Sequence, residues 1–234
     1  MQRLFISDLH LEAPTSPAFL RFSELLDHES RRVDEIYILG DLVEMWVGDD
    51  EDTGCAPLLR EVLQDAGANC NIFLMHGNRD FLFGETFAAA TGISLIDDPY
   101  VLDDDLLLCH GDMLCTDDVD YQAMRRTVRS PQWQQEFLSK SLAERQAFGA
   151  GLRAQSKANN ANKPSGIMDV NADALSQLMT QHTAKRLIHG HTHRPGHYQE
   201  RIVTGAWERC GWSCRQRDQV FTLECFSLAN PYPG

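Results

Sequence analysis

Residues 4–10 read LFISDLH, an apolar run that passes straight into a polar cluster. The same arrangement returns at 36–41 (IYILGD) and at 72–80 (IFLMHGNRD). Between these runs, apolar side chains at 19–26 and 58–63 recur with the spacing of one helix face. The alternation predicts a βαβαβ unit with a parallel sheet, and therefore an α/β fold.

The rest of the chain predicts further short strands and a helical segment. We expect strands at 101–102, 106–109, 186–188 and 220–226, helices at 118–129, 132–153 and 172–181, and a loop at 159–166. No internal repeat or linker interrupts this series. We therefore expect one domain over 1–234, with a basic helical insertion at about 121–163.

Charge and composition narrow the classes of protein. The formal net charge of −13 argues against a nucleic-acid binder. Residues 121–163, however, hold eight basic and two acidic residues, so this segment carries +6 and the remainder −19. Such a segment either binds an anionic ligand or balances the acidic body of the protein.

Cysteine spacing and hydropathy bear on the location of the protein. The irregular spacing of seven cysteines favours reduced thiols, and no apolar run is long enough to span a bilayer. We therefore expect a cytoplasmic protein.

Polar side chains follow each predicted strand, and ligand sites in parallel sheets gather at the carboxyl ends of strands. Asp8 and His10 are two residues apart in extended chain and can face the same way. Each short pattern, taken alone, is also typical of a surface turn. The run 189–193 (HGHTH), taken alone, is also typical of a solvated histidine cluster. Together, Asp-x-His, Gly-Asp, Gly-Asn, His-Gly-Asp and Gly-His-x-His occur in this order, each just after a predicted strand, and so indicate one shared metal site.

This ordered set of motifs resembles the calcineurin-like metallophosphoesterases. The resemblance implies a two-sheet αββα sandwich with a helical insertion and two metal ions. Asp8, His10, Asp41 and His193 would hold one ion, and Asp41, Asn78, His110 and His191 the other, with Asp41 bridging. Carboxylate, amide and imidazole ligands suit Mn²⁺, Fe²⁺ or Zn²⁺. Asp112 and His189 would either orient these ligands or make ordinary structural hydrogen bonds.

One position departs from the common family pattern. Many members carry Gly-Asn-His after the third strand, whereas this chain has Gly77-Asn78-Arg79. Arginine stays protonated and cannot serve as a general acid. We therefore predict a leaving group that departs without protonation, such as a phosphate, and hence a pyrophosphate substrate.

Longer stretches narrow the resemblance within the family: YILGDLVEMWVGDD (37–50), HGNRDF (76–81), HGDMLCTDD (110–118), IMDVN (167–171) and LIHGHTHRP (187–195). They are similar to members that act in lipid A biosynthesis. Those members use Mn²⁺ and hydrolyse UDP-2,3-diacylglucosamine to UMP and 2,3-diacylglucosamine 1-phosphate, by attack of water on the α-phosphorus. The resemblance makes Arg79 catalytic beside the seven metal ligands. It implies substrate contacts from Asn78, Arg79, Asp118, Ser156, Asn160, Lys163 and His191.

Four apolar residues in the insertion have the i,i+4 spacing of a helix face: Trp133, Phe137, Phe148 and Leu152. They either line a groove for acyl chains or pack on the sandwich. The resemblance implies peripheral contact with the anionic cytoplasmic face of a bacterial inner membrane. Two alternatives stay open from the sequence: another dinuclear enzyme acting on nucleotide pyrophosphates, or a non-catalytic scaffold of the same fold.

Overall fold

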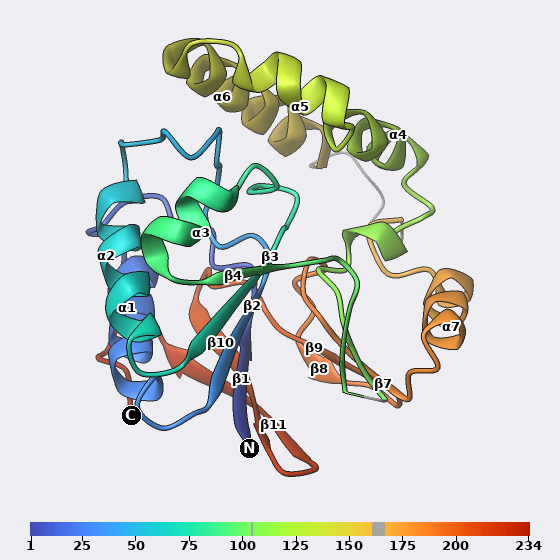
Figure 1. Ribbon diagram of the computed structural model, residues 1–234. Coiled ribbons are helices and arrows are strands. Elements are labelled where there is room, and N and C mark those ends of the chain that lie inside the picture. The colour runs from blue at the N-terminus through green and yellow to red at the C-terminus, as the bar shows by residue number, and fades with distance from the viewer. Residues whose placement is uncertain (104, 161–166) are drawn as a thin grey trace.

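Two β-sheets lie face to face, with helices covering their outer sides (Figure 1). The computed structural model describes residues 1–103, 105–160 and 167–234, and gives the backbone alone for 155–160. The first sheet has the order β11-β10-β1-β2-β3-β4: β11 (Val220–Ser227), β10 (Cys210–Arg217), β1 (Gln2–Ile6), β2 (Glu35–Leu39), β3 (Asn71–Met75), β4 (Ser94–Ile96). The second has the order β5-β6-β7-β9-β8: β5 (Tyr100–Asp103), β6 (Leu106–Leu108), β7 (Arg186–His189), β9 (Arg201–Val203), β8 (Gly196–His197).

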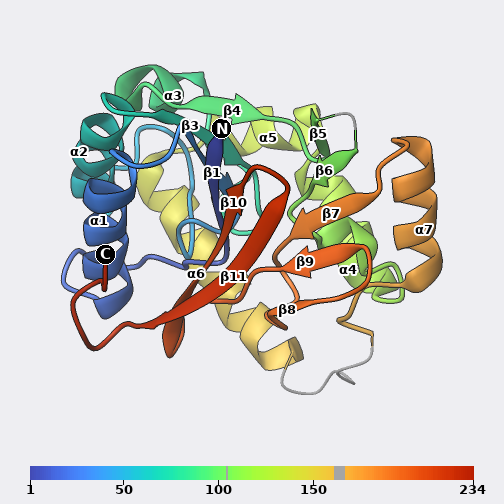
Figure 2. The same ribbon diagram turned by 90° about the horizontal axis from the view of Figure 1, so that it is seen from below.

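Three helices cover the first sheet and one covers the second, which gives the predicted αββα order of layers (Figures 1 and 2). The helices on the first sheet are α1 (Pro17–Glu29), α2 (Ala56–Gly67) and α3 (Glu85–Thr91), and α7 (Ala172–Gln181) lies on the second. Strands β1 to β3 are parallel, as the sequence predicts, and β4 pairs with β3 in the same direction. Helix α3 and strand β4 had not been predicted.

Consecutive apolar residues of the first sheet point to opposite faces of the sheet, so both faces are buried. Leu4 and Ile6 of β1 pack under the helices, whereas Phe5 points the other way, into the core between the sheets. There Phe5 stacks on Tyr37, with ring centroids 5.3 Å apart, and Tyr37 stacks on Phe73 at 4.7 Å. These apolar strands hold the loops at their carboxyl ends in place.

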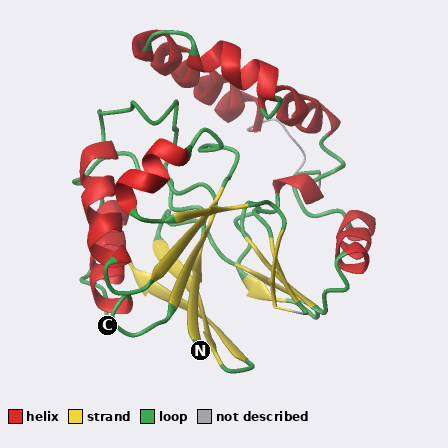
Figure 3. Ribbon diagram, in the orientation of Figure 1, coloured by secondary structure: helices red, strands yellow, loops and turns green. Residues whose placement is uncertain are grey.

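Three helices lie across the carboxyl ends of the strands, away from the chain termini (Figures 1 and 3). They are α4 (Val119–Val128), α5 (Pro131–Leu138) and α6 (Leu142–Asn160). The helix predicted at 118–129 and its break at Ser130-Pro131 are confirmed. The loop predicted at 159–166 is wrong at its first two residues, which end α6, and its remainder lies outside the described residues.

The single helix predicted at 132–153 is wrong, because the chain starts a new helix at Leu142. Ser141 and Glu144 form a reciprocal cap: the Ser141 N–H donates to the Glu144 carboxylate at 2.9 Å, and the Glu144 N–H donates to the Ser141 hydroxyl at 3.4 Å. These bonds satisfy helix-start donors and so favour two helices over one.

Candidate metal centre and substrate cavity

The seven candidate ligands lie on loops that leave five strands at one edge of the sandwich. They are Asp8 and His10 after β1, Asp41 after β2, Asn78 after β3, His110 after β6, and His191 and His193 after β7. A chain of short distances connects them all, so residues up to 185 positions apart in the sequence form one cluster.

One part of this cluster gathers around His10 and His193. Their Nε2 atoms are 3.4 Å apart, His193 Nε2 lies 3.7 Å from Asp8 Oδ1, and His10 Nε2 lies 3.8 Å from Asp41 Oδ2. Candidate ligand atoms of Asp8, His10 and His193 all lie within 4.8 Å of one another. These four residues are the set that the family resemblance assigns to the first metal.

The other part gathers around the side-chain oxygen of Asn78. His191 Nδ1 lies 2.9 Å and His110 Nε2 3.1 Å from Asn78 Oδ1, and His110 Nε2 lies 3.8 Å from Asp41 Oδ1. Asp8, Asp41 and His110 also approach within 4.8 Å. Asp8 thus belongs to both close groups, whereas the resemblance gives the bridging role to Asp41.

The backbone at the candidate ligands is strained. Among the described residues other than glycine, seven have positive φ, and five of these are candidate ligands: Asp8 (55°), His10 (48°), Asp41 (53°), His191 (63°) and His193 (54°). Such a conformation costs a residue with a side chain on the order of 1–3 kcal/mol. Strain of this kind persists where the surrounding fold enforces it, which is typical of functional sites.

Two glycines let the loops approach one another. A Cβ atom on Gly190 would lie 2.2 Å from Asp8 Oδ2, and one on Gly77 would lie 2.2 Å from Asp41 Oδ1. Any side chain at either position would displace a candidate ligand, which explains the glycines in these motifs.

The electrostatics of the cluster favour bound cations. Burial lowers the pKa of His10 and His110, yet nearby carboxylates more than offset it and raise each pKa to about 9. For Asp8, burial works to raise the pKa, and the hydrogen bond from His193 with the nearby imidazoles holds it below its ordinary value. A pocket that draws protons onto buried imidazoles is one where divalent cations can replace them. The donor set and its charge therefore fit two divalent metal ions.

A buried carboxylate outside the ligand set joins two of the loops. Asp80, fully buried, accepts hydrogen bonds from the N–H groups of Leu42 (2.6 Å), Gly77 (2.8 Å) and Asp41 (3.3 Å). Burial and the neighbouring Asp41 raise the pKa of Asp80 to about 6. Asp80 thus positions the loop of Asp41 against the loop of Asn78, a role that the sequence did not indicate.

Asp112 and His189 make structural contacts among the described residues. The Asp112 carboxylate accepts from Tyr121 Oη and Arg125 Nε, both at 2.7 Å, and so ties α4 to the loop after β6. His189 Nδ1 lies 2.9 Å from the Gly190 carbonyl oxygen. Of the two roles left open for this pair, these contacts support structural hydrogen bonding.

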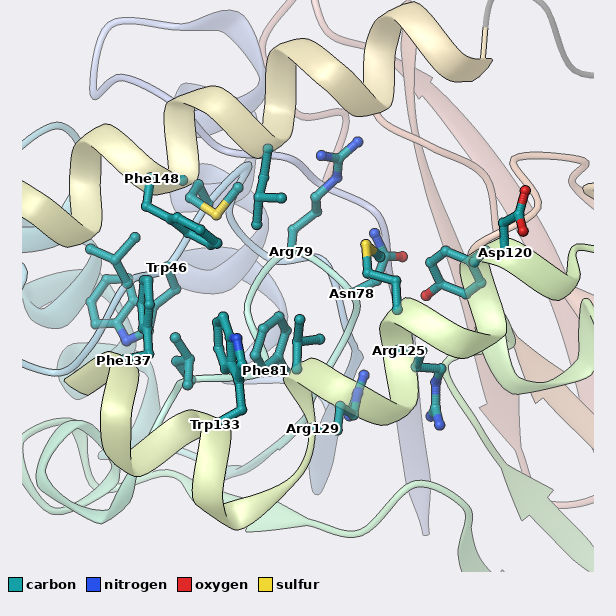
Figure 4. A pocket seen from close by; sticks show the side chains of 18 residues that line it. Trp46, Asn78, Arg79, Phe81, Asp120, Arg125, Arg129, Trp133, Phe137 and Phe148 are labelled. Atoms are coloured by element: carbon teal, nitrogen blue, oxygen red, sulfur yellow. The ribbon is translucent and has the colours of Figure 1, made fainter. Parts of the chain in front are cut away.

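A cavity of about 370 Å³ extends from the candidate ligand Asn78 beneath the helical insertion (Figure 4). Asn78, Asp120 and Arg125 lie at one end, and aromatic rings from both the body and the insertion gather at the other (Figure 4). The apolar lining includes Met45, Trp46, Val47, Phe81, Leu82, Met124, Val128, Trp133, Phe137, Phe148 and Leu152. Such an apolar cavity with polar groups at one end is typical of a ligand site.

The four apolar residues singled out in the insertion both line this cavity and pack on the body. Trp133, Phe137, Phe148 and Leu152 all line the cavity. Phe137 is also buried in the core of the body, and Trp133 lies against Phe81 with ring centroids 6.2 Å apart. One face of α5 and α6 therefore serves for packing and for lining the cavity.

Arginines of the insertion pair with carboxylates of the body. Arg125 contacts Asp98 and Asp112, Arg145 contacts Asp50, and Arg153 contacts Glu12 and Glu44. For these three arginines, the structure supports the second interpretation of the basic segment, that it balances the acidic body.

The predicted substrate contacts differ in where they lie. Asn78 and Arg79 line the cavity, and His191 lies beside it, with its ring centroid 5.9 Å from that of Tyr121. The Asp118 carboxylate accepts from the Tyr121 N–H and caps α4. The side chains of Ser156 and Asn160, and all of Lys163, lie outside the described residues.

Some cavity residues escaped the sequence analysis. Met45, Trp46 and Val47 directly follow the Asp41 loop and form one wall. The signal that marks them in the sequence is the apolar run 45–47 between Glu44 and the acidic stretch 49–52.

The chain matches a family model, known relatives and solved structures. Residues 1–195 match the model described as calcineurin-like phosphoesterase. A protein named UDP-2,3-diacylglucosamine hydrolase from Cellvibrio japonicus is 44% identical, over 91% of this chain and 93% of its own. The protein of the same name from Aromatoleum aromaticum is 47% identical, over 89% of this chain and 87% of its own. GAP50, described as the anchor in the inner membrane complex of Plasmodium, shares the fold, with a TM-score of 0.50, 11% identity, and coverage of 97% and 84% of the two chains.

Proposed function

This chain is an enzyme of the calcineurin-like phosphoesterase family, and we propose that it hydrolyses UDP-2,3-diacylglucosamine to UMP and 2,3-diacylglucosamine 1-phosphate, a reaction of lipid A biosynthesis. The observation that carries the proposal is the cavity, whose polar end meets the metal cluster and whose other end is aromatic and apolar. A substrate with a charged diphosphate and apolar acyl chains matches the two ends of this cavity in polarity.

We assign the metal-binding role to the seven clustered side chains, with Mn²⁺ as the preferred ion. Two divalent cations, when bound, would polarise the phosphate oxygens and activate a water molecule for attack. The two ligand carboxylates, Asp8 and Asp41, cancel half of the charge of two such ions, so a net positive charge faces the diphosphate. The seven side chains include no Ser or Cys, and two Asp and four His residues that hold metal ions would not be free to attack phosphorus, which supports direct attack by water.

Arg79 supplies a further positive charge at the junction of the two ends of the cavity. Its Nε atom is buried and has no hydrogen-bond partner among the described residues, so a phosphate oxygen of the substrate would satisfy it. Arg79 cannot protonate a leaving group, which supports a phosphate leaving group over an alkoxide. Faster hydrolysis of an unactivated alkyl phosphomonoester than of a UDP-sugar would contradict this role.

The proposed attack is on the α-phosphorus of the nucleotide. Water adds to this phosphorus, the bond to the bridging oxygen breaks, and the bridging oxygen leaves with the sugar 1-phosphate. Hydrolysis in ¹⁸O-labelled water should therefore place the label in UMP. Label in 2,3-diacylglucosamine 1-phosphate would show attack on the β-phosphorus instead.

The decisive experiment compares substrates. Mn²⁺-dependent release of UMP should be fast from UDP-2,3-diacylglucosamine and slow from UDP-N-acetylglucosamine, because the latter lacks acyl chains for the apolar end. Equal rates would indicate a general nucleotide pyrophosphatase. Fewer than one metal ion per chain in Mn²⁺-supplemented protein would favour the non-catalytic scaffold.

We further propose weak peripheral attachment to an anionic membrane. None of the helices within the described residues is long and apolar enough to cross a bilayer. The insertion nevertheless exposes apolar side chains, with Val119, Met124, Leu138 and Phe148 at 68%, 44%, 44% and 43% exposure. Apolar and basic side chains together favour binding at an anionic surface. The protein should sediment with anionic vesicles at low salt, and its absence from the pellet would refute the attachment.

A further inference from the structure

We propose that Glu44 is a positioning residue of the metal centre, which orients His10 for the metal and is itself held by Arg153 of the insertion. The inference rests on the proposed function, since it assumes that His10 is a metal ligand. Glu44 belongs to the loop after β2, three residues beyond Asp41.

The two ring nitrogens of His10 face different surroundings. Nε2 faces the metal cluster, 3.4 Å from His193 Nε2 and 3.8 Å from Asp41 Oδ2. Nδ1 faces away from the cluster and lies 3.0 Å from Glu44 Oε2. The two atoms lie within ion-pair distance, but the N–H bond does not point well enough at the oxygen for a hydrogen bond. Nδ1 is buried and has no other hydrogen-bond partner in the described part of the chain.

This arrangement selects one form of the imidazole. A carboxylate beside Nδ1 favours the proton on that nitrogen, which leaves the lone pair of Nε2 directed at the cluster. Histidines that bind metals commonly give their second N–H to a carboxylate, which fixes the ring and makes the ligand more basic. Glu44 stands where such a carboxylate is needed.

The second oxygen of Glu44 is fixed by the insertion. Arg153 Nε of α6 lies 2.8 Å from Glu44 Oε1, so each carboxylate oxygen has its own partner. The side chain of Glu44 is only 16% exposed, which limits its freedom to turn away. Contacts therefore run from α6 through Arg153 and Glu44 to His10, and join the cavity wall to the metal centre.

Glu12 offers a matched control. It also pairs with Arg153, but its side chain is 53% exposed, and among the described residues its ion pair is with Arg153 and not with His10. Glu12→Gln removes one negative charge next to the same arginine, as Glu44→Gln does. A difference between the two variants therefore reports on the contact with His10.

The test is a titration of chelator-treated full-length protein with Mn²⁺, followed by the electron paramagnetic resonance signal of the free ion. Wild type should bind two ions. In Glu44→Gln, one ion should bind about 10–100-fold more weakly while the other is unchanged, because Glu44 contacts one ligand of one metal. Glu12→Gln should bind both ions as wild type does. Activity of Glu44→Gln should recover at high Mn²⁺, which a merely misfolded protein would not show.

Three outcomes would overturn the inference. If Glu44→Gln binds both Mn²⁺ ions with affinities within twofold of wild type, the role of Glu44 is refuted while the proposed function stands. The same holds if the affinities for both ions fall equally. Wild type that binds no Mn²⁺ would instead refute the proposed metal centre. If thermal melting shows that Glu44→Gln does not fold, Glu44→Asp keeps the charge but withdraws it by one methylene, and unchanged affinity in that variant would refute the inference.

Discussion

Replacing Arg145 by alanine should loosen the insertion from the body of the enzyme. The side chain of Arg145 is 4% exposed, and it donates to two main-chain oxygens, that of Val47 at 2.6 Å and that of Lys140 at 3.1 Å. Its ion pair with Asp50 contributes little, because the Asp50 side chain is 61% exposed and solvent screens it. Hydrogen bonds from a charged donor contribute about 1.5–3 kcal/mol each, so we expect a total loss of about 3 kcal/mol.

Thermal melting and steady-state kinetics together measure this effect. In a chain of this size, a loss of about 3 kcal/mol lowers the melting midpoint by about 6–12 °C. KM for the diacylated substrate should rise, because Val47 forms part of the cavity wall. The control is Arg31→Ala, which removes an exposed pair with Asp27 and should shift the midpoint by little. A shift below about 2 °C in Arg145→Ala with unchanged KM would refute the anchoring role.

Further predictions concern the ligands and the cavity. Asp41→Ala should lower both kcat and Mn²⁺ affinity, whereas Lys163→Ala should mainly raise KM for substrate. A larger loss of kcat and of Mn²⁺ affinity in Lys163→Ala than in Asp41→Ala would contradict the assigned roles. Metal-free protein should lose stability as the pH rises from 6.5 to 9. His10 and His110 have a pKa of about 9 in the folded state, against an ordinary value of 6.5 in the unfolded state, so protonation stabilises the folded state at lower pH. A melting midpoint of chelator-treated protein that rises over this window would refute this. Phe137→Ala should slow hydrolysis of the diacylated substrate but not of UDP-N-acetylglucosamine, since the ring lines the apolar end of the cavity; equal loss on both substrates would place Phe137 in folding alone.

The candidate ligands could be predicted because several short patterns, each weak alone, follow the predicted strands in the order of one known family. Asp8 and His10 follow a strand whose apolar side chains are continuous, and parallel strands deliver their carboxyl ends to one edge. Apolar patterning predicted the parallel strands and the helices between them, and the family resemblance supplied the two-sheet order of layers, in which Phe5 and Tyr37 face away from the helices. In both cases each signal spans only a few residues, so the local sequence shows it.

Contacts between distant segments could not be predicted in the same way. The Arg153–Glu44 pair joins residues far apart in the chain, and their charges alone do not say which carboxylate meets which arginine. Helix ends in the insertion depended on the Ser141 and Glu144 cap, which a uniform apolar period at 132–153 concealed. The sequence by itself determined the first three strands, the positions of the candidate ligands and the α/β fold class, because these depend on apolar period and strand-end chemistry. The tertiary structure decided the cavity walls, the arginine anchors and the surroundings of His10, because these depend on which distant surfaces pack together.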